Sequence, residues 1–167
     1  PDTRKWNAFW IGSGETLHDW RGEVLPAPYF RQEFDFRGGK ECRLYLCGLG
    51  YHELRLNGKK VGDCELAPAP TNYDAHAGYL VYDVFGLLNP GRNAVGVVLG
   101  NGLYNCHTTE AWHFDKATWR DYPKLLLELV VDGETILSSD DCWRVSSSGP
   151  VTYDGLRNGE HYDARLE

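Results

Sequence analysis

The sequence predicts an all-β protein, a jelly-roll-like antiparallel β-sandwich with little helix. Short runs in which apolar and polar residues alternate recur along the chain, and a period of two turns one face of a strand toward a core and the other toward water. Asn-Gly, Pro-Gly and Asp-Gly pairs separate these runs and favour tight turns. No segment carries an apolar stripe with the 3.6-residue period of a helix. Many short strands between such turns predict two packed sheets.

In the first half of the chain, the alternating pattern predicts strands at residues 29–36, 43–49 and 52–57. Asn57-Gly58 then forms a hairpin turn, because both residues tolerate the positive φ of a type I′ turn. Residues 59–66 are expected to be the returning strand.

The second half continues the same pattern. We expect a short strand at residues 79–84, one helical turn at 84–88 that Pro90-Gly91 stops, and strong strands at 93–99 and 124–131. Asp132-Gly133 makes a second hairpin into residues 135–137, and residues 143–146 end the sheet-forming part.

The whole chain of 167 residues is long enough for one domain with a sizeable core. Residues 28–148 form the sandwich core in this interpretation. Residues 1–27 are a loop-rich arm whose aromatic side chains pack onto the core, and residues 149–167 are an exit segment.

Composition narrows the classes of partner. The net charge is −7 and no basic run occurs, so we expect no nucleic-acid partner, since an acidic surface repels phosphates. No apolar run is long enough to span a membrane, and we expect no membrane partner. The five cysteines have no C-x-x-C spacing and are interpreted as small buried hydrophobic residues, neither a disulfide framework nor a zinc site.

One connection is unusually long. Residues 101–122 join two strands without a clear element of their own, and loops of this length are uncommon unless they are functional or disordered. The segment is rich in aromatic side chains that can stack on a sugar ring, and it carries polar groups for hydroxyls. The candidate carbohydrate-binding residues are Asn101, Tyr104, Trp112, Asp115 and Trp119. The alternative is that the aromatics cap the sandwich or dock on a neighbouring domain.

Two stretches carry a resemblance to a known family. Residues 49–63 read LGYHELRLNGKKVGD and are followed by Pro70-Thr71-Asn72-Tyr73, and residues 82–104 read YDVFGLLNPGRNAVGVVLGNGLY. Together with the ending GEHYDAR at 159–165, they resemble the N-terminal β-sandwich domain of bacterial α-L-rhamnosidases. The resemblance covers most of the chain.

This resemblance implies a galactose-binding-like sandwich that is an accessory part of a glycoside hydrolase. In the family, the catalytic acids belong to a later (α/α)6-barrel domain, toward which residues 149–167 would lead. The chain itself would then not be an enzyme. The family is bacterial, and the resemblance suggests a periplasmic or secreted protein, with a cytoplasmic one left open.

Some relatives use this sandwich as a calcium-dependent L-rhamnose-binding module, whereas in others it packs as a scaffold. No cofactor is required in either interpretation. If calcium is bound, the candidate ligands are Asp63, Asn72 and Asp74, because calcium prefers carboxylate and amide oxygens. The sequence has Ala69-Pro70 and Leu103 where the family often has a tryptophan, so two stacking surfaces are missing.

Three functions stay open at this point. The first is an accessory domain that binds L-rhamnose or a rhamnose-containing glycan. The second is a structural scaffold that packs against the catalytic barrel of the parent enzyme. The third and most remote is an independent glycosidase, for which the 24 acidic residues offer no pair marked by a motif.

Overall fold

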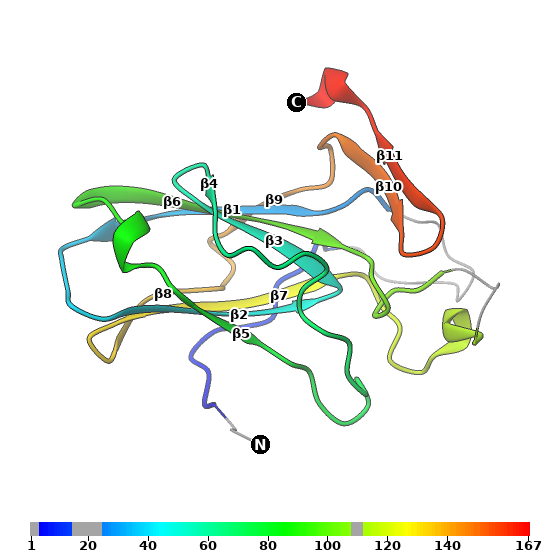
Figure 1. Ribbon diagram of the computed structural model, residues 1–167, viewed down its shortest axis with the longest axis horizontal. Helices are drawn as coiled ribbons and strands as arrows, with labels where there is room; N and C mark the ends of the chain where they lie inside the picture. Colours follow the sequence, from blue (N-terminus) through cyan, green and yellow to red (C-terminus); the bar gives the residue numbers. More distant parts are fainter. Residues whose placement is uncertain (1–3, 15–24, 108–111) are drawn as a thin grey trace.

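Two antiparallel sheets face each other in the computed structural model, which describes residues 4–14, 25–107 and 112–167 (Figure 1). The strand order is β4-β3-β6-β1-β9 in the five-stranded sheet and β5-β2-β7-β8 in the four-stranded sheet. The described part contains no α-helix, only three short 3₁₀ turns. The predicted all-β sandwich is therefore confirmed.

The strands of the five-stranded sheet are β1 (Tyr29–Phe36), β3 (Tyr51–Leu56), β4 (Lys59–Lys60), β6 (Gly91–Gly100) and β9 (Arg144–Ser146). Those of the four-stranded sheet are β2 (Cys42–Leu49), β5 (Leu80–Asp83), β7 (Lys124–Val131) and β8 (Glu134–Ser138). A separate hairpin consists of β10 (Val151–Gly155) and β11 (Gly159–Tyr162). The 3₁₀ turns are η1 (Phe85–Leu87), η2 (Phe114–Lys116) and η3 (Ala164–Leu166).

The core lies between the two sheets and follows the period of two. On β7, Leu125, Leu127 and Leu129 are fully buried and point toward the five-stranded sheet. The same hydrophobic cluster contains Phe30, Phe34 and Phe36 of β1, which pack against these leucines from the five-stranded sheet. Because successive side chains of a strand point to opposite faces, the intervening residues of β7 face away from this core.

The N-terminal arm covers that outer face of the four-stranded sheet. Ile11 and Leu125 exchange two backbone hydrogen bonds of 2.9 and 2.8 Å, so the arm pairs with β7. Glu128 is completely buried beneath the arm, where its carboxylate accepts hydrogen bonds from Arg4 and from the backbone N–H groups of Asn7 and Ala8. The Arg4 guanidinium also lies 3.6 Å from the centroid of the Tyr45 ring. The described residues of the arm thus pack on the sandwich through backbone and polar contacts, whereas Phe9 and Trp10, which were expected to pack onto the core, are 71% and 44% exposed.

Both predicted hairpin turns are present. Asn57 and Gly58 have φ of 53° and 80°, and Asp132 and Gly133 have φ of 49° and 89°. These values are the left-handed ones that a two-residue turn of this type requires.

The predicted strand at residues 59–66 is wrong beyond its start. Only Lys59 and Lys60 pair with β3, and the chain then turns away. Gly62 has φ of 79° and Leu66 has φ of 53°, neither of which fits an extended strand. A Cβ atom at Gly62 would lie 2.8 Å from the Tyr82 ring, so close packing against that ring adds to the reason for glycine here.

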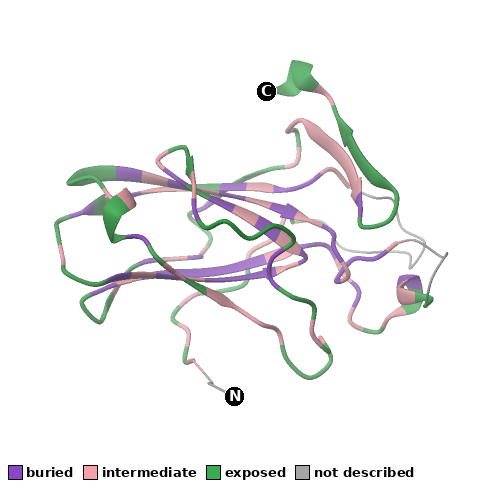
Figure 2. Cartoon of the chain, in the orientation of Figure 1, coloured by how far each residue is buried: buried purple, intermediate pink, exposed green. Residues whose placement is uncertain are grey.

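The β10–β11 hairpin was not predicted. It rises from the sandwich beside the ends of β1 and β3 (Figure 1). A backbone hydrogen bond of 3.1 Å from Ala27 N–H to the Val151 carbonyl helps to join it to the body. All four residues of β11 are exposed, as the green ribbon in Figure 2 shows. Val151 and Tyr153 alternate with polar residues in β10, but the run is only five residues long and β11 is mostly polar, so the sequence carries no clear strand signal here.

The cysteines divide into two groups. Cys42, Cys47 and Cys106 are buried as predicted, whereas Cys64 and Cys142 are exposed, which corrects the expectation that all five pack inside. Both exposed thiols lie in irregular segments outside the strands. None of the helices among the described residues is long and apolar enough to cross a membrane.

Candidate functional site

The long connection between β6 and β7 is held in an unusual backbone conformation. Trp112 and His113 have φ of 56° and 53°, just before the 3₁₀ turn η2. Left-handed backbone costs roughly 1–2 kcal/mol for a residue other than glycine. Two such residues in succession therefore identify this segment as a place where surrounding contacts impose a shape, which is common at binding sites.

Five aromatic rings form a continuous row through this segment. Tyr104 contacts Tyr73 with ring centroids 5.3 Å apart, and Tyr73 contacts Trp119 at 6.0 Å. The row continues from Trp119 to Phe114 at 6.2 Å and from Phe114 to Trp112 at 5.9 Å. It runs from a buried phenol, whose pKa burial raises to about 12, to an indole that is 71% exposed. The structure thus brings the three aromatic candidates Tyr104, Trp112 and Trp119 into one row.

An open pocket of about 420 Å³ lies along the middle of this row. Phe114, Trp119 and Leu103 form one wall, and the segment 70–74 forms the other. Its lining combines aromatic faces with the polar side chains of Thr71, Asn72 and Asp74. Pockets of this size and mixed lining are typical of small-molecule sites. Trp112 lies beyond the pocket, at the exposed end of the row.

Two of the three candidate calcium ligands reach the pocket. Asn72 Oδ1 accepts a hydrogen bond of 3.2 Å from the backbone N–H of Asp74. The Thr118 hydroxyl lies 3.0 and 2.9 Å from the two carboxylate oxygens of Asp74, to which it donates. Asn72 and Asp74 line the pocket, whereas Asp63 does not. The residues present supply one carboxylate and one amide oxygen at this place, a partial set for an ion that takes six to eight oxygens.

The polar candidates Asn101 and Asp115 are buried, with 2% of each exposed. Asn101 joins the segment to the hairpin, because its backbone N–H and its side-chain amide both donate to the Asp154 carboxylate, at 2.7 and 2.9 Å. Asp115 lies on η2, and neither of its carboxylate oxygens has a hydrogen-bond partner among the described residues. In the same part of the chain, the indole N–H of Trp119 is also buried without a partner. An unpaired buried polar group is costly. Trp119 lines the pocket, whereas Asp115 does not.

Burial shifts the pKa of two groups under the segment. It raises the pKa of the Asp154 carboxyl, and the hydrogen bonds from Asn101 oppose that rise. It lowers the pKa of His107, whose ring nitrogen lies 3.0 Å from the Tyr153 hydroxyl. Both groups lie where the segment 101–107 meets β10, so polar contacts dominate this junction.

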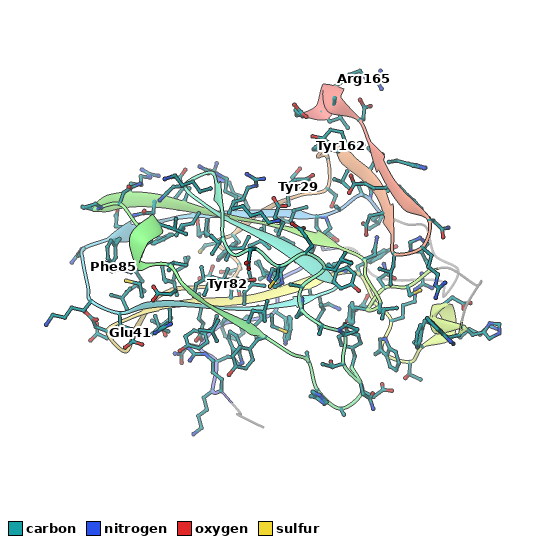
Figure 3. All side chains as sticks on the ribbon, viewed as in Figure 1. Tyr29, Glu41, Tyr82, Phe85, Tyr162 and Arg165 are labelled. Atoms are coloured by element: carbon teal, nitrogen blue, oxygen red, sulfur yellow. The ribbon has the colours of Figure 1, made fainter. Side chains whose placement is uncertain are left out.

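A second and larger hollow of about 830 Å³ lies between the hairpin and the outer face of the five-stranded sheet. Tyr29 stands on the sheet side and Tyr162 on the hairpin side (Figure 3). Its rim carries exposed apolar side chains: Leu66 is 63% exposed, Leu156 is 42% exposed and Tyr162 is 53% exposed. We call this hollow the hairpin groove.

Comparison with known proteins identifies the family. The family model described as the alpha-L-rhamnosidase N-terminal domain matches residues 39–167. The chain belongs to this family. It is 41% identical over 150 residues to an alpha-L-rhamnosidase of Formosa agariphila, a match that covers 84% of this chain and 15% of that protein.

Solved structures agree with this assignment. The alpha-L-rhamnosidase of Aspergillus terreus is 34% identical with a TM-score of 0.84, over 96% of this chain and 19% of that one. The Streptomyces avermitilis alpha-L-rhamnosidase, solved in complex with L-rhamnose, is 35% identical with a TM-score of 0.75, over 86% of this chain and 14% of that one. The chain thus spans less than a fifth of each of these relatives.

Sequence reasoning missed one member of the aromatic row. Tyr73 lies within it and contacts both Tyr104 and Trp119. Tyr73 belongs to the Pro70-Thr71-Asn72-Tyr73 motif that carried the family resemblance. That motif was the available signal, but only the fold shows that it faces the segment 101–122.

Proposed function

We propose that this chain is a non-catalytic accessory domain of an α-L-rhamnosidase and that it binds L-rhamnose or a rhamnose-containing glycan. The observation that carries the proposal is the pocket between the segments 70–74 and 103–119, with Phe114 and Trp119 on one side and Thr71, Asn72 and Asp74 on the other. Aromatic faces stack on the C–H surface of a sugar ring, and convergent polar groups bind its hydroxyls.

L-rhamnose suits such a lining because it is a 6-deoxy sugar. Its methyl group and C–H face are apolar and would lie against the aromatic wall, whereas its ring hydroxyls would face Asn72 and Asp74. The 420 Å³ of the pocket is within the usual range for small ligands. The Streptomyces avermitilis relative, which was solved with L-rhamnose, supports the choice of sugar.

Calcium is part of this proposal. Asn72 and Asp74 would supply two oxygens, and backbone carbonyls, water and sugar hydroxyls would complete the shell of six to eight. Bound calcium would neutralise the Asp74 carboxylate and orient vicinal hydroxyls of the sugar. Asp63, which does not line the pocket, would have no part in it.

Isothermal titration calorimetry of the purified domain tests both statements. We expect heat of binding with L-rhamnose in calcium buffer, with much less in the Trp119→Ala variant or after addition of a chelator. Trp10→Ala is the matched control, because Trp10 is 44% exposed on the N-terminal arm, outside the residues that line the pocket. An absence of heat at millimolar sugar, with calcium present, would refute the binding function.

A second candidate function, that of a scaffold, is favoured by the hairpin groove. Exposed Leu66, Leu156 and Tyr162 at one hollow form an apolar surface of the kind that marks protein interfaces. The neighbouring part would be the catalytic (α/α)6 barrel that the family resemblance implies. In this interpretation the groove packs against that barrel, whether or not the pocket holds a sugar.

The scaffold function is tested with Leu66→Ser in the isolated domain and in the complete parent enzyme. We expect the melting temperature of the isolated domain to stay within a degree or so, because an exposed side chain contributes little to folding. The parent enzyme should lose several degrees. Val81→Ser is the control, since Val81 is 47% exposed on the four-stranded sheet. Equal effects in both proteins would count against the scaffold.

The absence of catalysis is tested separately. We expect the purified domain to release no aryl alcohol from an aryl α-L-rhamnoside, and turnover would favour the independent glycosidase. A periplasmic or secreted location belongs to the same proposal, since glycans outside the cell would be the ligands.

A further inference from the structure

A continuous chain of hydrogen bonds joins the β10–β11 hairpin to the far side of the pocket. It begins at Asp154 on β10, whose carboxylate accepts from the backbone N–H and the side-chain amide of Asn101 at 2.7 and 2.9 Å. The Asp154 carbonyl accepts from the same amide at 3.1 Å. Three hydrogen bonds therefore fix the first residue after β6 to one residue of the hairpin.

This series of hydrogen bonds continues through two more buried side chains. Asn105 donates from Nδ2 to Asn101 Oδ1 at 2.6 Å, and Arg120 donates from Nε to Asn105 Oδ1 at 2.9 Å. Arg120 Nη1 then donates to the backbone carbonyl of Asp115 at 3.2 Å. Asp115 follows Phe114, and Arg120 follows Trp119, so this series of hydrogen bonds ends at the residues next to the two rings that wall the pocket.

The backbone is shaped around this contact. A Cβ atom at Gly100 would lie 3.2 Å from Asp154 Oδ1, so a side chain there would press on the carboxylate. Asn101, Asn105 and Arg120 are 2%, 1% and 9% exposed. Buried hydrogen bonds to a charged group are worth more than those between neutral groups, so this link is stiff.

Two further contacts lie on the same side. His107 Nε2 and the Tyr153 hydroxyl are 3.0 Å apart, joining the end of the segment 101–107 to β10. The Arg157 guanidinium, in the hairpin turn, lies 4.7 Å from the centroid of the Trp112 ring. The hairpin thus contacts the aromatic segment at its start and at its exposed end.

We infer that Asp154 is the positioning residue of the sugar pocket: it holds the Phe114 and Trp119 wall in place through Asn101, Asn105 and Arg120. The identity of the ligand as a sugar rests on the proposed function, whereas the role of Asp154 in holding the shape of the pocket does not.

The test uses the Asp154→Asn variant, which keeps the shape of the side chain. The substituted side chain has one acceptor oxygen, so its amide would meet the amide of Asn101 donor to donor. We expect the indole N–H signal of Trp119 to move in a ¹⁵N-correlated NMR spectrum and the affinity for L-rhamnose to fall roughly tenfold. The indole signal of Trp143, which is buried and donates to the Ser138 carbonyl at 2.9 Å, should stay in place.

Glu160→Gln is the matched control. Glu160 pairs with Asp154 across the same hairpin and is exposed, and no hydrogen bond joins its carboxylate to the described part of the segment 101–120. We expect this variant to keep the Trp119 signal and the sugar affinity of the unmodified domain. An unchanged Trp119 signal in Asp154→Asn, or an equal shift in Glu160→Gln, would overturn the inference.

The two proposals fail in distinguishable ways. If the unmodified domain binds no L-rhamnose, the proposed function fails, while the Trp119 signal still decides the role of Asp154. If Asp154→Asn does not fold, Asn105→Ala replaces it, because it removes the side chain that links Asn101 to Arg120. We expect the Trp119 signal to shift in Asn105→Ala, and no shift would overturn the inference.

Discussion

The buried imidazole of His52 gives the domain a stability that depends on pH. His52 lies on β3, and its Nε2 is 2.9 Å from the hydroxyl of Tyr82 on β5, so the contact joins the two sheets. Its Nδ1 is buried and has no partner within the described part of the chain. Burial lowers the pKa of His52 from 6.5 to about 4. Protonation in the folded protein would leave an N–H donor without an acceptor, which agrees with this direction.

The direction in which stability changes with pH follows from the lowered pKa. The unfolded chain takes up a proton at pH values where the folded ring stays neutral, so the stabilisation is complete above the unfolded pKa of 6.5 and is lost as the pH falls toward 4. Integrated from pH 7 to pH 5, the extra proton uptake of His52 in the unfolded chain should lower the free energy of unfolding by about 2 kcal/mol.

Urea denaturation at pH 7 and pH 5 measures this contribution. In His52→Gln, which has no titratable ring, the loss between the two pH values should be smaller by about 2 kcal/mol. Tyr82→Phe keeps most of the burial and should keep most of the pH dependence, because burial is the cause of the shift. If His52→Gln and the unmodified domain lose the same stability, the ring is not buried in its neutral form and the reasoning fails.

Two further predictions concern the sandwich. Glu128→Ala should cost about 3–5 kcal/mol of unfolding free energy, because it leaves the Arg4 charge and two backbone N–H groups without their buried acceptor. Urea denaturation measures this cost, with the exposed Glu41→Ala as the control. Similar costs for the two variants would contradict the account. Leu127→Ala should cost about 2–5 kcal/mol, because Leu127 is fully buried between the sheets; a melting temperature within about 2 °C of the unmodified domain would contradict that packing.

Local rules accounted for the strands and the turns. Alternation located β1, β2 and β3, and apolar β-type runs located β6 and β7, each to within one or two residues. Asn57-Gly58 and Asp132-Gly133 adopt the positive φ that these residue pairs favour. Such features depend on a few neighbouring residues and are therefore visible in the sequence.

Features that depend on distant contacts were not visible. The predicted strand at residues 59–66 ended early because Gly62 packs against Tyr82, a residue from another sheet. Glu128 is buried beneath the N-terminal arm, and its hydrogen bond from the Ala8 N–H spans 120 positions of the sequence. A single sequence holds no record of such partners.

The candidate site shows the same division. The aromatic composition of the segment 101–122 identified Trp119 and Trp112, yet the other wall of the pocket comes from residues 70–74. Asn101 was selected for its place in the long segment, whereas its partner Asp154 lies 53 positions later. The sequence thus predicted the aromatic and polar character of the site, whereas the residues that form its two walls are known only from the fold.

The most direct test of the central claim is an amide NMR titration of the domain with L-rhamnose in calcium buffer. The claim is that the sugar binds between the segments 70–74 and 103–119. We expect saturable shifts of the backbone signals of Asn72 and Asp74 and of the Trp119 indole. Shifts confined to the hairpin groove, or no saturable shift at millimolar sugar, would contradict it.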